Sequence, residues 1–212
     1  MRIPASLAGR LAGALRADAL RTRLMKALSA LGLYRRLTLA EVPLSDIVPA
    51  RPYTVKAEAR LLREDDLEAY GRFRPDADLG EIRDRLRAGQ QCSSLWIGPR
   101  VVGASWAVRG RAWIAYLDRT LDLGPDGAYI YDSFTAPDLR GRQLETMRAT
   151  FLRRTLREQG VRRAFAAALD ENTGARRIRD KHAHRPVAVV GYWKLGPWRR
   201  DFLRWIDPGP AG

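Results

Sequence analysis

Leucines recur every three to five positions along the first forty residues, and this spacing predicts one or two amphipathic helices. Three prolines between residues 43 and 52 then indicate an extended linker. The pattern therefore divides the chain into a helical extension over 1–45, a Pro-rich linker over 46–53 and a domain over 54–212. The leucines that carry the periodicity are Leu7, Leu11, Leu15, Leu20, Leu24, Leu28 and Leu31.

Within the domain, strand and helix signals alternate. Acidic residues at 64–66 cap a first helix, and Leu79, Ile82 and Leu86 form the apolar stripe of a second. Gly98 and Pro99 separate two apolar runs, as the turn of a hairpin does. The predicted strands cover 54–62, 93–108 (as a hairpin), 111–123, 128–135, 162–170, 186–195 and a last strand after the turn at 196–200. The predicted helices cover 64–73, 78–89, 144–160 and a stretch that opens near residue 172.

Residues 128–160 form the most informative segment. A strand rich in aromatic and β-branched residues stops at Pro137, and an amphipathic helix then runs to Gly160. Between them, Arg140, Gly141 and Arg142 place two cations and a flexible backbone at the first free N–H groups of the helix. Such an arrangement stabilises a pyrophosphate, so a phosphorylated cofactor is expected here.

This segment resembles the central motif of the GNAT superfamily of acyl-coenzyme A (CoA) dependent acyltransferases. In that motif a strand and a short Pro-containing link lead to Arg/Gln-x-x-Gly-x-Gly/Ala at the start of a long helix. Gln143 stands at the motif's fourth position, which is a glycine, and Glu145 stands at its sixth position, which is a small residue, so both depart from the pattern. The residues in the six positions are Arg140, Gly141, Arg142, Gln143, Leu144 and Glu145.

The order of predicted elements over residues 54–205 also fits this family. A second family pattern is half kept: Asn172, Ala175 and Lys181 match it, whereas its tyrosine, glycine and phenylalanine are replaced. The resemblance implies an α/β fold with a mixed, mostly antiparallel central sheet flanked by helices. In the second pattern, Arg179 replaces the tyrosine, Ala183 replaces the glycine and His184 replaces the phenylalanine.

The resemblance further implies the chemistry and the residues that serve it. An amine, or less often a hydroxyl, attacks the thioester of acetyl-CoA or another acyl-CoA directly in a ternary complex. A backbone N–H of the central strand stabilises the developing oxyanion. The implied cofactor-binding residues are Ser133, Phe134, Thr135, Arg140, Gly141, Arg142, Gln143, Leu144, Glu145 and Asn172.

Asp132 is the carboxylate best placed to act as the catalytic base. The competing interpretation is a loop-capping acceptor, which is a common role for aspartate near a strand end. The tyrosine that usually protonates the leaving thiolate in this family is Arg179 here, and a guanidinium does not donate a proton at neutral pH.

Composition narrows the class of protein. The 212 residues are 46% hydrophobic, which suffices for one core, and the single Cys92 excludes an intrachain disulfide. A reducing compartment such as the cytoplasm is expected, and no apolar run is long enough for a membrane span. The net charge of +14 invites nucleic acid as a partner, but 34 of the 38 cations are arginine, a bias that GC-rich coding also produces. Nucleic acid is therefore not the expected partner.

The first forty residues carry eight cations and one anion. Their apolar face can pack on the acyltransferase domain or on a second subunit, which would make a homodimer. It can also lie on an anionic membrane as a peripheral contact, and a cleaved organellar presequence shares the same composition. The sequence leaves these alternatives open.

His182 and His184 are the only histidines, and no metal site is expected from them because no third ligand is evident nearby. The sequence as a whole predicts an acyl-CoA-dependent N-acyltransferase, most simply an N-acetyltransferase, that acts on a small-molecule or protein amine. The alternatives are a non-catalytic GNAT-fold binding or scaffold module, favoured by Gln143, Glu145 and Arg179, and a peripheral membrane or nucleic-acid binder that works through its basic N-terminus.

Overall fold

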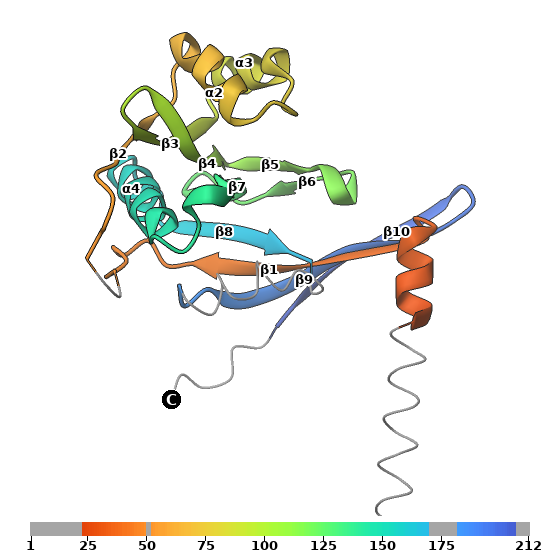
Figure 1. Cartoon of the computed structure of the whole chain (residues 1–212). Coiled ribbons are helices and arrows are strands. Elements are labelled where there is room, and N and C mark those ends of the chain that lie inside the picture. Colours follow the sequence, from red (N-terminus) through yellow and green to blue (C-terminus); the bar gives the residue numbers. More distant parts are fainter. Residues whose placement is uncertain (1–22, 50–51, 170–181, 207–212) are drawn as a thin grey trace, which may run out of the picture.

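The structure is a computed structural model that describes residues 23–49, 52–169 and 182–206. Eight strands form one sheet in the order β10-β9-β1-β8-β7-β4-β3-β2, and a separate two-stranded hairpin, β5–β6, lies beside it (Figure 1). The strands are β1 (Tyr34–Val42), β2 (Glu58–Leu61), β3 (Gln91–Ile97), β4 (Arg100–Arg109), β5 (Arg111–Ile114), β6 (Arg119–Asp122), β7 (Gly127–Thr135), β8 (Arg163–Ala168), β9 (Arg185–Leu195) and β10 (Trp198–Trp205).

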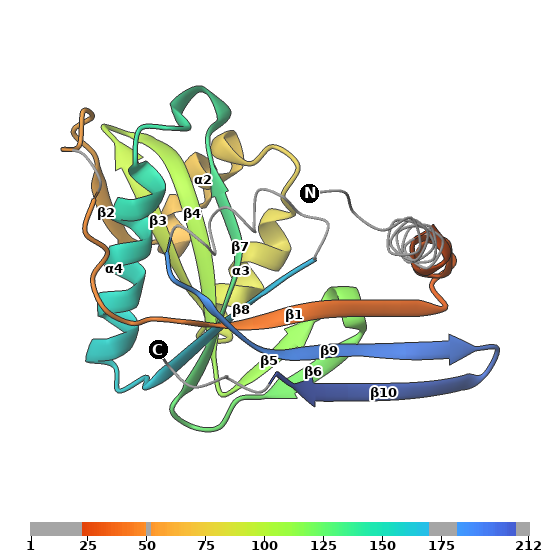
Figure 2. The ribbon, with the colours of Figure 1, turned by 90° about the horizontal axis from the view of Figure 1, so that it is seen from below.

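Three labelled helices pack on this sheet: α2 (Leu67–Phe73), α3 (Leu79–Arg87) and α4 (Leu144–Glu158). Helices α2 and α3 cover one face of β3 and β4, and α4 lies on the opposite face (Figure 2). Residues 23–30 form a further helical segment that precedes β1. None of the helices in the described part of the chain is long and apolar enough to span a bilayer.

The expected fold class is confirmed: every strand pair is antiparallel except β7 with β8. The predicted elements from residue 58 to residue 168 are present. Helix α3 is capped by Asp78, whose carboxylate accepts from the N–H groups of Gly80 and Glu81. The run 111–123 forms a hairpin in its own small sheet rather than part of the main one. The helix predicted to open near Asn172 lies almost entirely outside the described residues.

The predicted boundary of the N-terminal extension is wrong. Residues 34–42, assigned to a helical extension, form β1, which pairs antiparallel with both β8 and β9 in the interior of the sheet. The physical reason is visible in the burial of the strand: Leu37 and Leu39 pack into the core on one face, and Ala40 and Val42 are buried too. A strand buried on both faces loses the apolar-polar alternation that marks a strand in sequence. The domain therefore begins at about β1 and not at residue 54.

The sheet opens in its middle. Strands β7 and β8 are paired from Gly127 with Arg163 to Ile130 with Ala166, but β7 continues to Thr135 along β4. Beyond Ile130 the two strands therefore separate. One half-sheet is β2-β3-β4-β7 and the other is β8-β1-β9-β10, and α4 lies across the opening between them (Figure 2).

Candidate active site

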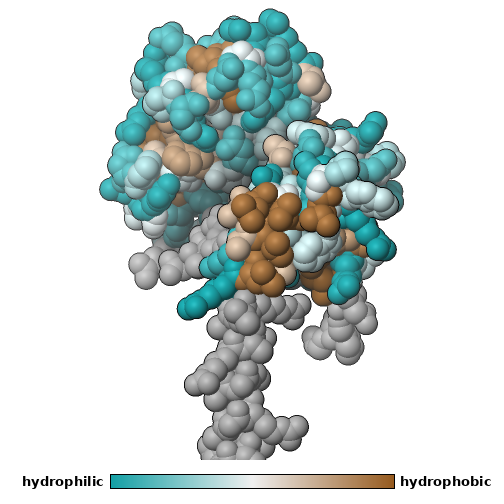
Figure 3. Space-filling model, turned by 90° about the vertical axis from the view of Figure 1, so that its right-hand side faces the viewer, coloured by the Kyte–Doolittle hydropathy of each residue, from teal (hydrophilic) through white to brown (hydrophobic). Residues whose placement is uncertain are grey.

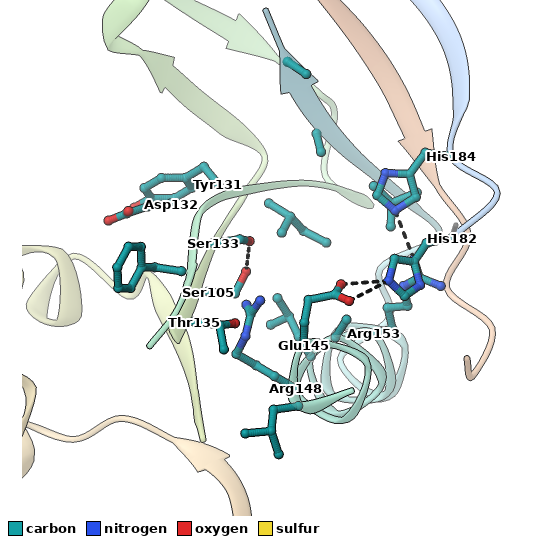
Figure 4. A pocket seen from close by; sticks show the side chains of 18 of the residues that line it. Ser105, Tyr131, Asp132, Ser133, Thr135, Glu145, Arg148, Arg153, His182 and His184 are labelled. Carbon is teal, nitrogen blue, oxygen red and sulfur yellow. Dashed lines mark hydrogen bonds and ion pairs between the residues drawn. The ribbon is translucent and has the colours of Figure 1, made fainter. Parts of the chain in front are cut away.

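The opening between β7 and β8 holds a cavity of about 860 Å³. This is within the usual range for a small-molecule or cofactor site. Strand β7 forms one wall, α4 forms another, and β8 and β1 form the third, with Thr38, Ala40 and Val42 contributed by β1. Figure 4 shows the polar side chains that converge on it.

A β-bulge interrupts β7 at this cavity. Tyr131 pairs with Trp106 and Phe134 pairs with Ala104, so two residues of β7, Asp132 and Ser133, face one residue of β4. Asp132 takes a left-handed backbone conformation with φ 45°, which is uncommon for a residue with a side chain. A bulge leaves the extra residue outside the regular ladder, so backbone polar groups here are available to a ligand.

Two serine hydroxyls mark the position of the bulge. Ser105 of β4 lies opposite the bulge, and its Oγ is 2.5 Å from Ser133 Oγ. Ser105 is 2% exposed, whereas Ser133 is exposed. Both line the cavity, so the hydroxyl pair bridges its buried end and its open side.

The N-terminus of α4 faces the same cavity. Gly141 has φ 79° and Gln143, the N-cap of α4, has φ 61°, so the chain makes two left-handed steps before the helix starts. The position that the GNAT motif reserves for glycine thus has a backbone that favours glycine, and Gln143 occupies it at a cost of about 1 kcal/mol. The Gln143 side chain does not cap α4. Arg140 precedes this turn and donates from Nε to the carbonyl oxygen of Thr135 at 3.4 Å.

Most of the residues expected to bind the cofactor come together here. Arg142 is exposed and does not line the cavity, and Asn172 lies outside the described residues. The expected residues that do line it are Asp132, Ser133, Phe134, Thr135, Arg140, Gly141, Gln143, Leu144 and Glu145.

Asp132 is held by two arginines. Its Oδ1 accepts from Arg74 Nη1 at 3.1 Å, and its Oδ2 lies 3.5 Å from Arg85 Nη1. Both carboxylate oxygens of Asp132 therefore have a guanidinium partner. The contacts tie the bulge to α3 and to the segment between α2 and α3, which suits a positioning role for Asp132.

Tyr131, next to the bulge, points away from α4 and donates to Gln90 Oε1. Burial raises the pKa of Tyr131 to about 12, so its hydroxyl is neutral at physiological pH. It serves as a wall of the site on the side of α3.

Glu145 has a partner that the sequence did not suggest. His182 Nε2 lies 2.8 Å from Glu145 Oε1 and 2.9 Å from Oε2. The His182 side chain is 1% exposed, and its Nδ1 is buried without a hydrogen-bond partner. An N–H of His182 that donates to the carboxylate offsets part of the negative charge that Glu145 brings to the start of α4. Glu145 is therefore less repulsive to a phosphate than its position alone predicts.

Two buried arginines of α4 complete the site. Arg148 and Arg153 are each 3% exposed, and burial lowers the pKa of both. Arg153 Nη2 lies 3.1 Å from His184 Nε2, and its Nη1 donates to the carbonyl of Ser45 at 3.5 Å. Arg148 Nε is buried without a partner. Figure 4 shows the Arg148 side chain directed toward Ser105 and Ser133.

The sequence analysis did not place the two histidines in the site. Both line the cavity, where His182 bonds to Glu145 and His184 lies within hydrogen-bond distance of Arg153. In the described ranges, no group of three or more His, Cys, Asp and Glu residues is arranged to hold a metal ion.

The sequence did contain a signal for Arg148. It lies four residues after Leu144 and four before Leu152, so it interrupts the buried stripe of the helix with a cation. No comparable signal marks Ser105 or His182, because their roles depend on strands and turns that meet only in the folded chain.

A comparison of the sequence with protein-family models and with curated proteins finds no match. Solved structures do match. A protein of unknown function from Staphylococcus epidermidis is 11% identical, with a TM-score of 0.52 over 79% of this chain and 64% of that one. A protein assigned to the GNAT family from Novosphingobium aromaticivorans is 16% identical, with a TM-score of 0.51 over 74% of this chain and 62% of that one. An aminoglycoside N-acetyltransferase in complex with CoA is 17% identical, with a TM-score of 0.48 over 58% of this chain and 87% of that one.

The chain thus spans less than two thirds of the first two proteins. Likeness at this level of identity concerns the fold. The protein has a GNAT fold, with the opened sheet, the bulged central strand and the helix start in the arrangement described above.

Proposed function

We propose that this protein is an acyl-CoA-dependent N-acyltransferase. The observation that carries the proposal is that one cavity has the β7 bulge on one wall and the open N-terminus of α4 on the other. The first arrangement suits a developing oxyanion, and the second suits a pyrophosphate. An acyl-CoA carries both groups, separated by a pantetheine arm.

In this proposal each part of the site has one task. The first N–H groups of α4 and the guanidinium of Arg140 bind the pyrophosphate. A backbone N–H at the bulge, along Ser133, Phe134 and Thr135, donates a hydrogen bond to the carbonyl oxygen of the thioester. Asp132 orients the attacking amine by accepting a hydrogen bond from it, since its own charge is already balanced by Arg74 and Arg85.

The amine nitrogen forms the new bond to the carbonyl carbon, and the bond from carbon to sulfur breaks. The proton that the amine loses ends on solvent or on the departing thiolate. Arg179 stands where the family has the tyrosine that protonates the thiolate, and a guanidinium does not donate a proton at neutral pH, so proton transfer through water is the expected route. The acceptor is an amine of a small molecule or of a protein.

Titration with acetyl-CoA and with free CoA tests the proposal. A ligand that binds only the folded protein at 100 times its dissociation constant adds about 2.7 kcal/mol of stability, so both should raise the midpoint of thermal unfolding. Pantetheine without phosphates should have a smaller effect. If none of the three shifts the midpoint and calorimetry detects no heat, the non-catalytic binding module is the better description, with Gln143 and Glu145 as the reason.

A further inference from the structure

Arg148 is a buried cation for which the described chain provides no hydrogen-bonded anion. It is 3% exposed, its Nε has no partner, and no carboxylate of the described residues lies within ion-pairing distance of its guanidinium. Buried charges in proteins are normally paired or hydrogen-bonded, because an isolated charge in the interior is costly. The position therefore calls for an explanation.

The carboxylates nearest the cavity are already engaged. Glu145 accepts from His182, and Asp132 is bound by Arg74 and Arg85. A second buried cation, Arg153, lies on the same helix and bonds to His184 and Ser45. The interior of the cavity thus carries an excess of positive charge that a bound anion can balance.

The location of the guanidinium restricts which anion this is. A Cβ placed on Gly103 would lie 3.5 Å from Arg148 Cδ, so the stem of Arg148 runs along β4 and its head lies beneath the bulge, near Ser105 (Figure 4). The phosphate cradle is elsewhere, at the start of α4 beside Arg140, which is exposed. A phosphate bound in that cradle does not account for Arg148.

The two faces of the bulge also differ. Asp132 and Tyr131 face α3, which carries Arg85, and the segment between α2 and α3, which carries Arg74. This is the side proposed for the acceptor. Arg148 approaches from α4, the side of the donor. An anion that reaches Arg148 therefore extends from the acyl end of the donor.

We propose that Arg148 binds the terminal carboxylate of a dicarboxylic acyl group, so that the preferred donor is the CoA monothioester of a short dicarboxylic acid. This rests on the proposed function. The reaction remains an aminolysis: the amine forms a bond to the thioester carbon, CoA departs as a thiol with the proton that the amine releases, and the distal carboxylate passes unchanged into the amide product. Ser105 and Ser133 supply hydroxyl donors beside the guanidinium.

The test compares two stable thioethers of CoA that differ in one group. S-(3-carboxypropyl)-CoA carries the carboxylate, and S-butyl-CoA has the same chain length without charge. Calorimetry should show about 10- to 100-fold tighter binding of the carboxylated thioether to the wild-type protein, the range for one hydrogen bond to a charged partner. Free CoA, titrated in parallel, reports whether the CoA site exists at all.

Arg148→Met, which keeps a long side chain without the charge, should abolish this preference. Arg154→Met is the matched control, because Arg154 lies on the exposed side of α4 and pairs with Asp46, and it should retain the preference. If Arg148→Met does not fold, the wild-type comparison still decides. Equal binding of the two thioethers to the wild-type protein, or an undiminished preference in Arg148→Met, overturns the proposal. Binding of free CoA without any preference leaves the acyltransferase assignment intact, and loss of all CoA binding removes both.

Discussion

The arginines of this protein are used in two different ways. Those on the surface form exposed pairs, such as Arg154 with Asp46 at 2.6 Å and Arg72 with Glu68 at 2.5 Å. Such pairs contribute little stability because water and salt screen them. Arg148 and Arg153 are instead buried beside the cavity. There each charge interacts more strongly with a bound anion, and its desolvation costs more folding free energy.

Arg140 and Arg142 provide a test of the phosphate cradle. Arg140 lines the cavity, whereas Arg142 is exposed and outside it. Arg140→Ala should weaken CoA binding by about 10- to 100-fold, because one charge-assisted hydrogen bond is lost. Arg142→Ala should leave the dissociation constant nearly unchanged. If calorimetry shows equal losses of CoA affinity in the two variants, binding depends on the overall charge of this turn and not on a contact of Arg140.

Cys92 provides a test of burial. Desolvation raises the pKa of the Cys92 thiol to about 12, and the thiolate is the reactive form. The folded protein should therefore resist iodoacetamide at pH 8, and labelling should follow unfolding as urea is added. The unfolded thiol ionises at about pH 8.5, so stability should also fall as the pH rises above that value. Rapid labelling of the folded protein, measured by mass spectrometry, would contradict the buried position.

At the scale of elements, β1 is the least expected part of the fold. It fills the space between β8 and β9 and also forms part of the cavity wall. Its contact with β9 is close: a Cβ placed on Gly191 would lie 2.2 Å from the carbonyl oxygen of Arg35. Strand β1 is thus a structural part of the domain, joined to it through its ladders with β8 and β9.

Two truncations distinguish the contribution of β1 to stability from that of the residues before it. Removal of residues 1–45 deletes β1 and should abolish cooperative thermal unfolding, because the core on one face of β1 is opened, a wall of the cavity on its other face is lost, and β8 and β9 lose their shared neighbour. Removal of residues 1–22 leaves every described element in place, and the unfolding midpoint should change by only a few degrees. A stable, cooperative fold after the longer truncation would show that β1 is an addition to a complete domain.

At the scale of the whole molecule, exposed apolar side chains gather at one end. The turn between β9 and β10 presents Leu195 and Trp198, which are 76% and 81% exposed, and Leu31 beside β1 is 71% exposed. Figure 3 shows an apolar patch on this side of the molecule. Lys194, Arg199 and Arg200 lie in the same two strands, and the chain carries a net charge of +14. Tryptophan and leucine next to cations are typical of surfaces that bind anionic membranes.

We expect the intact protein to sediment with vesicles that contain anionic lipid and to remain in solution with neutral ones. Binding should weaken with added salt, because the attraction is partly electrostatic. The double variant Leu195→Ser and Trp198→Ser should lose most of the binding. Trp113→Ser serves as the control, since Trp113 is 59% exposed but lies on β5. Concentration-dependent dimerisation without vesicle binding would assign this patch to a second subunit instead.

The sequence by itself determined the segment that matters most. The strand over β7, the Arg140–Gly141 turn and the helix α4 follow from local periodicity and from backbone preferences that act over a few residues. For the same reason the hairpin of β3 and β4 and the cap of α3 at Asp78 were predictable. Each of these depends on neighbours in the chain.

The tertiary structure decided the features that depend on contacts between residues far apart in the chain. Residues 34–42 became an interior strand because β8 and β9 pair with both of its edges, and a strand buried on both faces carries no clear periodic signal. Packing likewise placed His182 against Glu145, which is 37 residues away along the chain, and buried Arg148 beneath the bulge. A charge in the apolar stripe of a helix can be recognised in the sequence. Which anion it can bind depends on the walls of the cavity, which form only when the sheet folds.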